Sequence, residues 1–289
     1  METRQLLGKP VRDEVLAELA SRVRAAARPP GLAVILVGDD PASAVYVRSK
    51  EQACATLGYR HETHRFPPDV AEGRVLACLE ALNADPGIDG ILVQLPLPPH
   101  LDSERVLAEV DPAKDVDGFH PENLGRLASG RPRFVPCTPK GVLRLLQHYD
   151  IATAGRRVAI VGRSVIVGRP LALLLALKGP AGDATVTLCH SATPDLARST
   201  RAAEIVVAAM GVPRFLGRDH VAEGATVVDV GITRLPAAAG EKPQLAGDAD
   251  AAALAGWAGA LTPVPGGIGL MTVAMLMENT WESASRRGA

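Results

Sequence analysis

Short apolar runs alternate with stretches of helical periodicity along the whole chain. In the first half the pattern predicts strands at 32–38, 60–66 and 90–97, with helices at about 41–57, 71–84 and 103–110. In the second half it predicts strands at 156–162, 184–189, 204–209, 226–231 and 257–262. The first of these is followed by a crossover helix that contains PLALLLALK. Strands that alternate with helices are typical of parallel βαβ units, so the sequence predicts two α/β layer structures.

A segment rich in Pro and Gly, 111–141, interrupts both periodicities and indicates the region between two domains. The 289 residues suit two domains of ordinary size. We therefore expect an N-terminal domain at 1–140 and a second domain at 141–270, which flank a cleft. The amphipathic segment that begins MTVAMLMENT predicts a last helix, 271–289, which we expect to pack on the first domain.

Charge and cysteine content exclude several classes of protein. The chain has 31 Lys and Arg against 32 Asp and Glu, a net charge of −1, which gives little support to nucleic-acid binding. The run LALLLAL at 171–177 is too short to cross a bilayer, and the first residues lack a signal-peptide pattern. The four cysteines form no C-x-x-C and no metal-ligand pattern. We expect a cytoplasmic protein with reduced cysteines and no metal.

The segment RRVAIVGRSVIVGRPLALLLALKG has the order strand, tight loop, helix of a dinucleotide site. Gly162 ends the strand, Ser164 stands where a second glycine is usual, and Gly168 allows close approach of the backbone. Pro170 suits the first turn of a helix whose N-terminus would face a pyrophosphate. The pattern alone is also found in proteins that bind no nucleotide. The three strands that follow favour a Rossmann unit.

The end of the next strand, LCHSATPD, lacks the acidic residue that usually binds the ribose 2′-hydroxyl of NAD. His190 and Ser191 stand there instead, and Arg163 follows the preceding strand. This combination favours NADP, whose 2′-phosphate an arginine could bind. The alternative is that Arg163 is a solvated loop residue.

The predicted helix 41–57 carries Ser43, Tyr46, Val47, Lys50, Cys54 and Leu57 on one apolar stripe. A lysine on such a stripe can extend its ammonium to water. It can also be desolvated, with its pKa lowered towards the range useful for proton transfer. The position after the first strand, where open α/β sheets bind ligands, favours the second interpretation for Lys50.

Three other polar residues and one cysteine are candidates with open alternatives. Gln94 interrupts an apolar strand and is either a structural amide or a ligand contact. In AKDVDGFHPEN, Asp115 and Asp117 either bind a ligand or cap a turn. Cys137 lies in a polar loop, where the sequence favours a packing role over a reactive thiol.

Several of these motifs occur together in one known family. GDDPAS-x-x-Y-x-x-x-K, DGILVQLPLP, KDVDGFHP, CTP-x-G, GRS-x-IVGRP, DVGI and TPVPGGIG-x-MTVAMLMENT follow one another over nearly the whole chain. In this order they closely resemble the bifunctional methylenetetrahydrofolate dehydrogenase/methenyltetrahydrofolate cyclohydrolase family, FolD.

The resemblance implies a homodimeric enzyme of one-carbon metabolism with an N-terminal folate-binding, catalytic domain and a C-terminal Rossmann domain that binds NADP. Lys50 would be the catalytic lysine, Tyr46 would stack on the folate, Gln94 would tune Lys50 and Asp117 would bind the pterin. Gly266 and Gly267 would shape the substrate side of the site. The cofactor contacts would come from Gly162, Arg163, Ser164, Gly168, Ser191 and Ile232.

Three positions depart from the family pattern: Leu270 replaces a proline, Ala192 follows His-Ser, and Thr233 replaces an asparagine after DVGI. None of them removes a catalytic group. The alternatives are a dehydrogenase without cyclohydrolase activity, a dehydrogenase for another small substrate, and a binding protein without catalysis. Retention of Tyr46, Lys50, Gln94 and Asp117 together favours the bifunctional enzyme.

Overall fold

A computed structural model describes residues 2–236 and 244–287 of the chain. The chain divides into two compact units. The six-stranded unit consists of Met1–Arg12 and Thr138–Thr272, and the three-stranded unit of Asp13–Cys137 and Val273–Ala289. The polypeptide therefore passes from one unit to the other three times. Gly288 and Ala289, at the end of the predicted last helix, lie outside the described residues.

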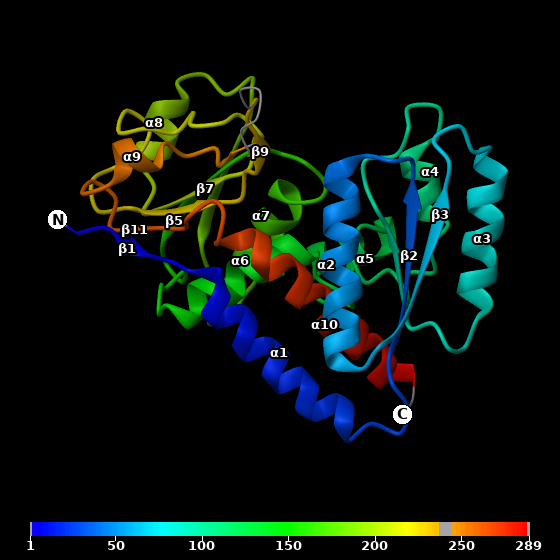
Figure 1. Cartoon of the computed structure of the whole chain (residues 1–289). Helices are drawn as coiled ribbons and strands as arrows, with labels where there is room; N and C mark the ends of the chain where they lie inside the picture. The colour runs from blue at the N-terminus through cyan, green and yellow to red at the C-terminus, as the bar shows by residue number, and fades with distance from the viewer. Residues whose placement is uncertain (1, 237–243, 288–289) are drawn as a thin grey trace. The chain divides into compact units, whose positions relative to one another are not determined.

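The six-stranded unit contains a parallel sheet in the order β1-β11-β8-β7-β5-β6 (Figure 1). Its strands are β1 (Arg4–Gln5), β5 (Arg157–Val161), β6 (Thr185–Cys189), β7 (Ile205–Ala208), β8 (Thr226–Asp229) and β11 (Ala260–Leu261). Its other elements are α6 (Cys137–His148), α7 (Gly168–Ala176), α8 (Leu196–Arg201), α9 (Ala251–Leu254) and the antiparallel pair β9 (Thr233–Arg234) and β10 (Leu245–Ala246). From β5 the chain first adds β6 on one side and then β7 on the other, so the strand order reverses between β5 and β7, as in a Rossmann fold.

The three-stranded unit contains a parallel sheet in the order β3-β2-β4. Its strands are β2 (Gly31–Val37), β3 (Arg60–Phe66) and β4 (Gly90–Val93). Its helices are α2 (Pro41–Leu57), α3 (Glu72–Ala84), α4 (Ser103–Ala108), α5 (Pro121–Ala128) and most of α1 (Gly8–Arg24) and α10 (Ile268–Arg287). Every residue of β2 is buried, as expected for a central strand covered on both faces.

The helices α1, α6 and α8 were not predicted, and the strand predicted at 257–262 is limited to Ala260–Leu261. Two further differences concern segments with candidate site residues. The strand predicted at 90–97 ends at Val93, so Gln94 follows the strand rather than interrupting it. The turn-rich segment 111–141 contains the helix α5, which begins after His120. Nδ1 of His120 accepts a hydrogen bond from Glu122 N at 3.0 Å, and Pro121 occupies the first turn. Proline at this position starts a helix, although in the sequence it reads as a breaker.

A buried carboxylate links three parts of the three-stranded unit. Asp89 is fully buried and accepts two hydrogen bonds of 2.7 Å from the guanidinium of Arg28. It accepts a third, of 2.9 Å, from Gly31 N at the start of β2. Arg287, near the end of α10, lies 3.8 Å from the same carboxylate. The ends of α1 and α10 are thereby tied to the sheet. Among the described residues, no helix combines the length and the apolar character needed to cross a membrane.

We expect Arg28→Ala to lower the free energy of unfolding by about 2 kcal/mol, because the Asp89 carboxylate loses its main counter-charge while it stays buried. Urea titration at pH 7 measures the change. Arg24→Ala is the control, since Arg24 is exposed on α1 and its guanidinium donates to Oγ of Ser21 at 3.2 Å. Equal stability of the two variants would contradict this account of Asp89.

Candidate functional site

The helix α2 places Lys50 on a buried face. Asp40 caps its N-terminus by accepting a hydrogen bond from Ser43 N at 2.8 Å. The predicted stripe is buried at Ser43, Val47, Lys50, Cys54 and Leu57, whereas Tyr46 keeps 38% of its surface exposed. The prediction of the apolar face is therefore confirmed, with Tyr46 at its open edge.

The ammonium of Lys50 stays inside the protein. The residue is 7% exposed, and Nζ donates a hydrogen bond of 2.8 Å to Oε1 of Gln94. The amide of Gln94 is itself oriented, because Nε2 donates to the carbonyl of Leu95 at 2.8 Å. Since α2 follows β2 and Gln94 follows β4, the contact forms where the carboxyl ends of adjacent parallel strands meet. Lys50 thus does not extend to water.

Burial shifts the pKa values of Lys50 and Asp117 towards each other. Desolvation lowers the pKa of Lys50, and the charges of Asp117 and Cys137 oppose this shift. Desolvation raises the pKa of Asp117 to about 6, and the charge of Lys50 opposes that shift. Burial also raises the pKa of the Tyr46 hydroxyl. A lysine and a carboxyl group shifted in this way are suited to exchange protons near neutral pH.

The alternative that an aspartate caps a turn applies to Asp115. Its carboxylate accepts hydrogen bonds from His120 N at 2.8 Å, from Phe119 N at 3.3 Å and from Nδ2 of Asn123 at 2.8 Å. These bonds hold the loop closed and leave Asp117 available for another role. Gly118 completes the turn with φ +75°.

Cys137 belongs to the same group of residues, which the sequence did not indicate. It is 1% exposed at the start of α6, and its thiol is a hydrogen-bond partner of Asp117. This bond favours the ionised form of the carboxyl group. The burial of Cys137 agrees with the packing role that the sequence favoured. The residue begins α6, however, and does not lie in a loop.

The predicted phosphate loop has the geometry that close approach requires. Gly162 has φ +122°, and a Cβ there would lie 2.0 Å from the carbonyl oxygen of Ala209. A Cβ at Gly168, the first residue of α7, would lie 1.9 Å from the carbonyl oxygen of Gly162. Oγ of Ser164 accepts a hydrogen bond from Val167 N at 3.2 Å. Only glycine fits at positions 162 and 168, so the loop can present its backbone to a pyrophosphate.

Arg163 and Ser191 follow two strands that pair in register. Val161 lies opposite Cys189, and Gly162 N donates to the carbonyl of Cys189 at 2.9 Å. Arg163 and Ser191 are both exposed at this edge of the sheet. His190 orders its own turn, since Nδ1 accepts a hydrogen bond from Ala192 N at 3.2 Å. The turn therefore forms with an alanine at position 192. The exposed position of Arg163 at the end of its strand suits an arginine that binds a ribose phosphate.

The remaining predicted residues lie near the start of α10 in the six-stranded unit. Ile232 is 40% exposed, and its Cδ1 would lie 2.9 Å from a Cβ on Gly269. Gly266 has φ +111°, and its carbonyl accepts a hydrogen bond from Gly8 N at 2.8 Å. At Gly267 a Cβ would lie 2.7 Å from the carbonyl oxygen of Pro263. Leu270 N donates to the carbonyl of Gly267 at 3.2 Å, a bond that a proline could not make.

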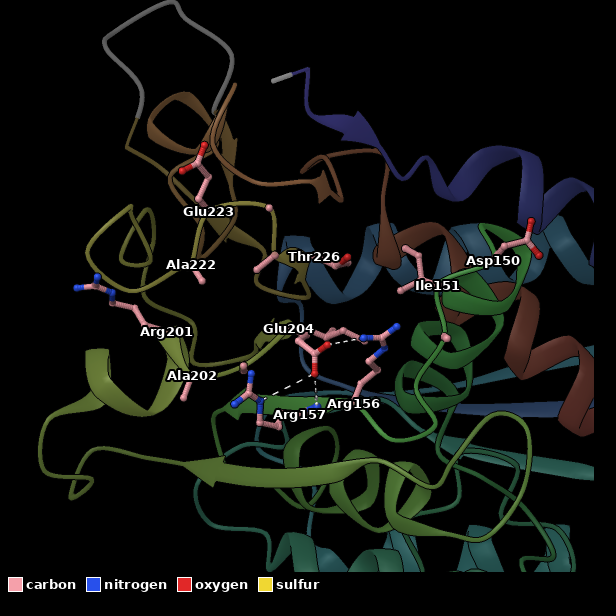
Figure 2. A pocket seen from close by; sticks show the side chains of 15 residues that line it. Asp150, Ile151, Arg156, Arg157, Arg201, Ala202, Glu204, Ala222, Glu223 and Thr226 are labelled. Carbon is pink, nitrogen blue, oxygen red and sulfur yellow. Dashed lines mark hydrogen bonds and ion pairs between the residues drawn. The ribbon is translucent and has the colours of Figure 1, made fainter.

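A separate pocket of about 480 Å³ opens at the opposite edge of the six-stranded sheet (Figure 2). It lies at the first residues of β5, β7 and β8. Figure 2 shows Glu204 beside Arg156 and Arg157, and Glu204 bonds to Nη1 of Arg156 at 2.6 Å and to Arg157 N at 3.1 Å. Over the whole lining, the three carboxylates of Asp150, Glu204 and Glu223 balance the three guanidinium groups of Arg156, Arg157 and Arg201. The predicted phosphate loop lies at the other ends of these strands, so this pocket is not the predicted cofactor site.

The fold, the glycine loop around Gly162 and the group formed by Lys50, Gln94 and Asp117 define a class of protein. A parallel sheet with a glycine-containing loop at the point where the strand order reverses is typical of dinucleotide binding. A buried lysine with an amide and a carboxyl group is typical of an enzyme that moves protons. The molecule is thus a two-domain α/β protein of the dinucleotide-dependent enzyme class.

Comparison with known proteins identifies the particular family. Residues 6–117 match the model of the tetrahydrofolate dehydrogenase/cyclohydrolase catalytic domain, and residues 136–288 match that of the family's NAD(P)-binding domain. The chain belongs to the tetrahydrofolate dehydrogenase/cyclohydrolase family. The bifunctional protein FolD of Desulfovibrio desulfuricans is 52% identical over 286 residues, which cover 98% of each chain.

Two solved structures extend the comparison. The bifunctional FolD dehydrogenase/cyclohydrolase of Campylobacter jejuni is 42% identical, with a TM-score of 0.92 over 99% of each chain. The methylenetetrahydrofolate dehydrogenase-cyclohydrolase of Trypanosoma brucei, solved with NADP cofactor and an inhibitor, is 37% identical with a TM-score of 0.93 over 99% of this chain and 98% of its own. Both support the fold class predicted from the sequence.

The raised pKa of Asp117 predicts a pH-dependent stability. Its value of about 6 in the folded protein exceeds the ordinary 3.8, so the folded state binds the proton more tightly than the unfolded state. Ionisation of Asp117 therefore lowers stability as the pH rises from about 4 to above 6. We expect Asp117→Asn to be more stable than the wild type at pH 7.5, on the order of 2 kcal/mol, and to lose this advantage at pH 4.5.

Urea unfolding at the two pH values measures this effect, with Asp39→Asn as the control because Asp39 is exposed. An advantage of Asp117→Asn that is equal at both pH values would show that ionisation of this carboxyl group is not its cause.

Proposed function

We propose that the protein oxidises 5,10-methylenetetrahydrofolate to 5,10-methenyltetrahydrofolate with NADP, and then hydrolyses the product to 10-formyltetrahydrofolate. The observation that carries this proposal is the buried Lys50 ammonium, hydrogen-bonded to Gln94, in a chain that belongs to a dehydrogenase/cyclohydrolase family. The three-stranded unit would bind the folate, and the six-stranded unit would bind NADP. The predicted domain limits, 1–140 with 271–289 and 141–270, remain part of this proposal.

The cofactor side of the reaction uses the six-stranded unit. Gly162 and Gly168 would let the loop and the start of α7 approach the pyrophosphate, since no Cβ fits at either position. Arg163, Ser164 and Ser191 would contact the cofactor, together with Ile232. NADP, when bound, supplies the acceptor for the hydride that leaves the methylene carbon. This step depends on positioning more than on proton transfer.

The hydrolysis uses the three-stranded unit. Water adds to the methenyl carbon, and the bond from that carbon to one ring nitrogen breaks. The added oxygen loses both of its protons as the formyl C=O forms; one proton reaches the freed ring nitrogen and the other is released to solvent. Lys50 would carry out these transfers, because desolvation lowers its pKa and Gln94 fixes Nζ at 2.8 Å. The pKa of about 6 leaves Asp117 mostly ionised at pH 7, so that it can accept hydrogen bonds from the pterin. The exposed edge of Tyr46 would stack on the folate, and Gly266 and Gly267 would shape the substrate side of the site.

We further propose that the enzyme is a homodimer and works in the cytoplasm. The family resemblance supports this assignment. Sedimentation equilibrium of the purified protein tests the dimer, and a single species with the mass of one chain would contradict it.

The first functional test separates the two activities. Incubation of the wild type with methylenetetrahydrofolate and NADP should produce both NADPH and 10-formyltetrahydrofolate. The absorbance of NADPH and of the methenyl intermediate measures the two steps. Lys50→Met retains the stem but removes the proton carrier, so cyclohydrolase activity should fall by about two to four orders of magnitude. Dehydrogenase activity should partly survive, and the methenyl intermediate should accumulate.

Arg48→Met is the control for this test, because Arg48 lies on the exposed face of α2. It should keep both activities. Near-normal hydrolysis by Lys50→Met would exclude Lys50 as the proton-transfer residue, and equal loss of both activities with loss of folded protein would assign it a structural role.

The second test concerns the choice of cofactor. We expect kcat/KM to be higher with NADP than with NAD, and Arg163→Ala to raise the KM for NADP by about 10- to 100-fold, since a hydrogen-bonded ion pair with the 2′-phosphate is lost. The KM for NAD should change little. Arg201→Ala, at the opposite edge of the sheet, is the control. Equal efficiency of the wild type with both cofactors would contradict the assignment to NADP.

A further inference from the structure

We propose that Asn279 of α10 is a positioning residue for Asp117: its side-chain amide joins the two backbone segments that carry Asp117 and Cys137. The inference rests on the proposed role of Asp117 in binding the folate. Asn279 does not contact the reacting atoms in this scheme and acts only through the segments that it joins.

The contacts of Asn279 are made inside the three-stranded unit. The residue is fully buried, and Nδ2 donates to the carbonyl of Val116 at 2.8 Å and to the carbonyl of Val135 at 3.0 Å. Sγ of Cys137 lies 3.8 Å from the same nitrogen. One side-chain nitrogen therefore reaches the residue directly before Asp117 and a residue two positions before Cys137.

The two segments pack closely where Asn279 joins them. A Cβ on Gly118 would lie 2.9 Å from the backbone nitrogen of Pro136, so that only glycine allows this approach. Sγ of Cys137 lies 3.5 Å from the carbonyl of Val116, and the thiol is a hydrogen-bond partner of Asp117. A displacement of either segment would therefore move the Asp117 carboxyl group relative to Cys137 and Lys50.

The chemistry of the contact requires two donors on one short side chain. The amide of asparagine supplies two N–H groups in a plane, and they diverge enough to reach two carbonyl oxygens. A serine places its donor one bond closer to the backbone and has a single O–H, so it can satisfy one carbonyl at most. A buried carbonyl without its donor weakens the structure around it. Asn279 is thus suited to hold both segments at once.

The same helix offers a matched control. Ser283 lies one turn further along α10 and is 1% exposed. Its Oγ lies 2.6 Å from the carbonyl oxygen of Asp89 and 2.9 Å from that of Ala113, so its single O–H donates to one of them at a time. It also links α10 to backbone carbonyls of the three-stranded unit. Its contacts involve neither Val116 nor Val135. Ser283→Ala therefore measures how weaker packing of α10 by itself affects stability and kinetics.

The test compares Asn279→Ser and Ser283→Ala with the wild type at a temperature well below all three unfolding midpoints. We expect Asn279→Ser to lower kcat/KM for methylenetetrahydrofolate by about 10- to 100-fold, mainly through KM, because a binding group has been displaced. The KM for NADP should stay within about twofold of the wild type. Ser283→Ala should lower the unfolding temperature by a similar amount and leave both KM values within about twofold.

The outcomes separate the inference from the proposed function. Wild-type kinetics in Asn279→Ser, or equal kinetic losses in the two variants, would overturn the positioning role while the proposed function stands. A wild type without turnover of methylenetetrahydrofolate would overturn the proposed function and this inference with it. If Asn279→Ser does not fold, Asn279→Gln carries the same comparison, since it keeps both donors on a stem one methylene longer.

Discussion

The removal of the Lys50 ammonium from water is the constraint on which the arrangement of the three-stranded unit depends. A buried charge is unfavourable unless hydrogen bonds and opposite charges surround it. The amide oxygen of Gln94 accepts a hydrogen bond from the ammonium, and the charge of the nearby Asp117 offsets part of the desolvation. Each comes from a different segment, so the strands, the loop and the helix α2 must all be in place before the lysine can be buried. The chemistry of the site and the stability of the unit are thereby linked.

Both units use the same property of parallel sheets. In the three-stranded sheet the central strand β2 has β3 on one side and β4 on the other, and Lys50 and Gln94 follow β2 and β4. In the six-stranded sheet the strand order reverses between β5 and β7, where Gly162 packs against Ala209. Loops at such a point separate from one another, which leaves room for a ligand. One principle therefore accounts for the positions of the proton-transfer group and of the phosphate loop.

The parts of this arrangement that short-range patterns determine could be predicted from the sequence. The stripe on α2 placed Lys50 on the apolar face but left open whether its ammonium reaches water, and the strand–loop–helix pattern located Gly162 and Gly168. The helix α5 was missed, because Pro121 and the glycines around it resemble loop residues unless the cap by His120 is known. The contact of Lys50 with Gln94 spans 44 residues and follows from strand order rather than from any local pattern.

Cys137 and Asn279 could not be placed by the same means. Asn279 meets Val116 and Val135 across 163 and 144 residues, and polar residues on an amphipathic helix usually face solvent. Nothing in the periodicity of α10 distinguishes an asparagine that joins two loops from one that is hydrated. The roles of these residues depend on tertiary contacts alone.

The discontinuity of the three-stranded unit bears on how the protein is made. After the short segment Met1–Arg12 of the six-stranded unit, a ribosome delivers residues 13–137, then the rest of that unit, and only afterwards the segment from Val273 onward. Until that segment emerges, the carbonyls of Val116 and Val135 lack the amide that joins them. The nascent chain can form the β3-β2-β4 sheet early, but the segments around Asp117 reach their final geometry after synthesis of the last helix. Vectorial synthesis thus separates assembly of the scaffold from completion of the site, and a chain released early would carry a sheet without an ordered Asp117 loop.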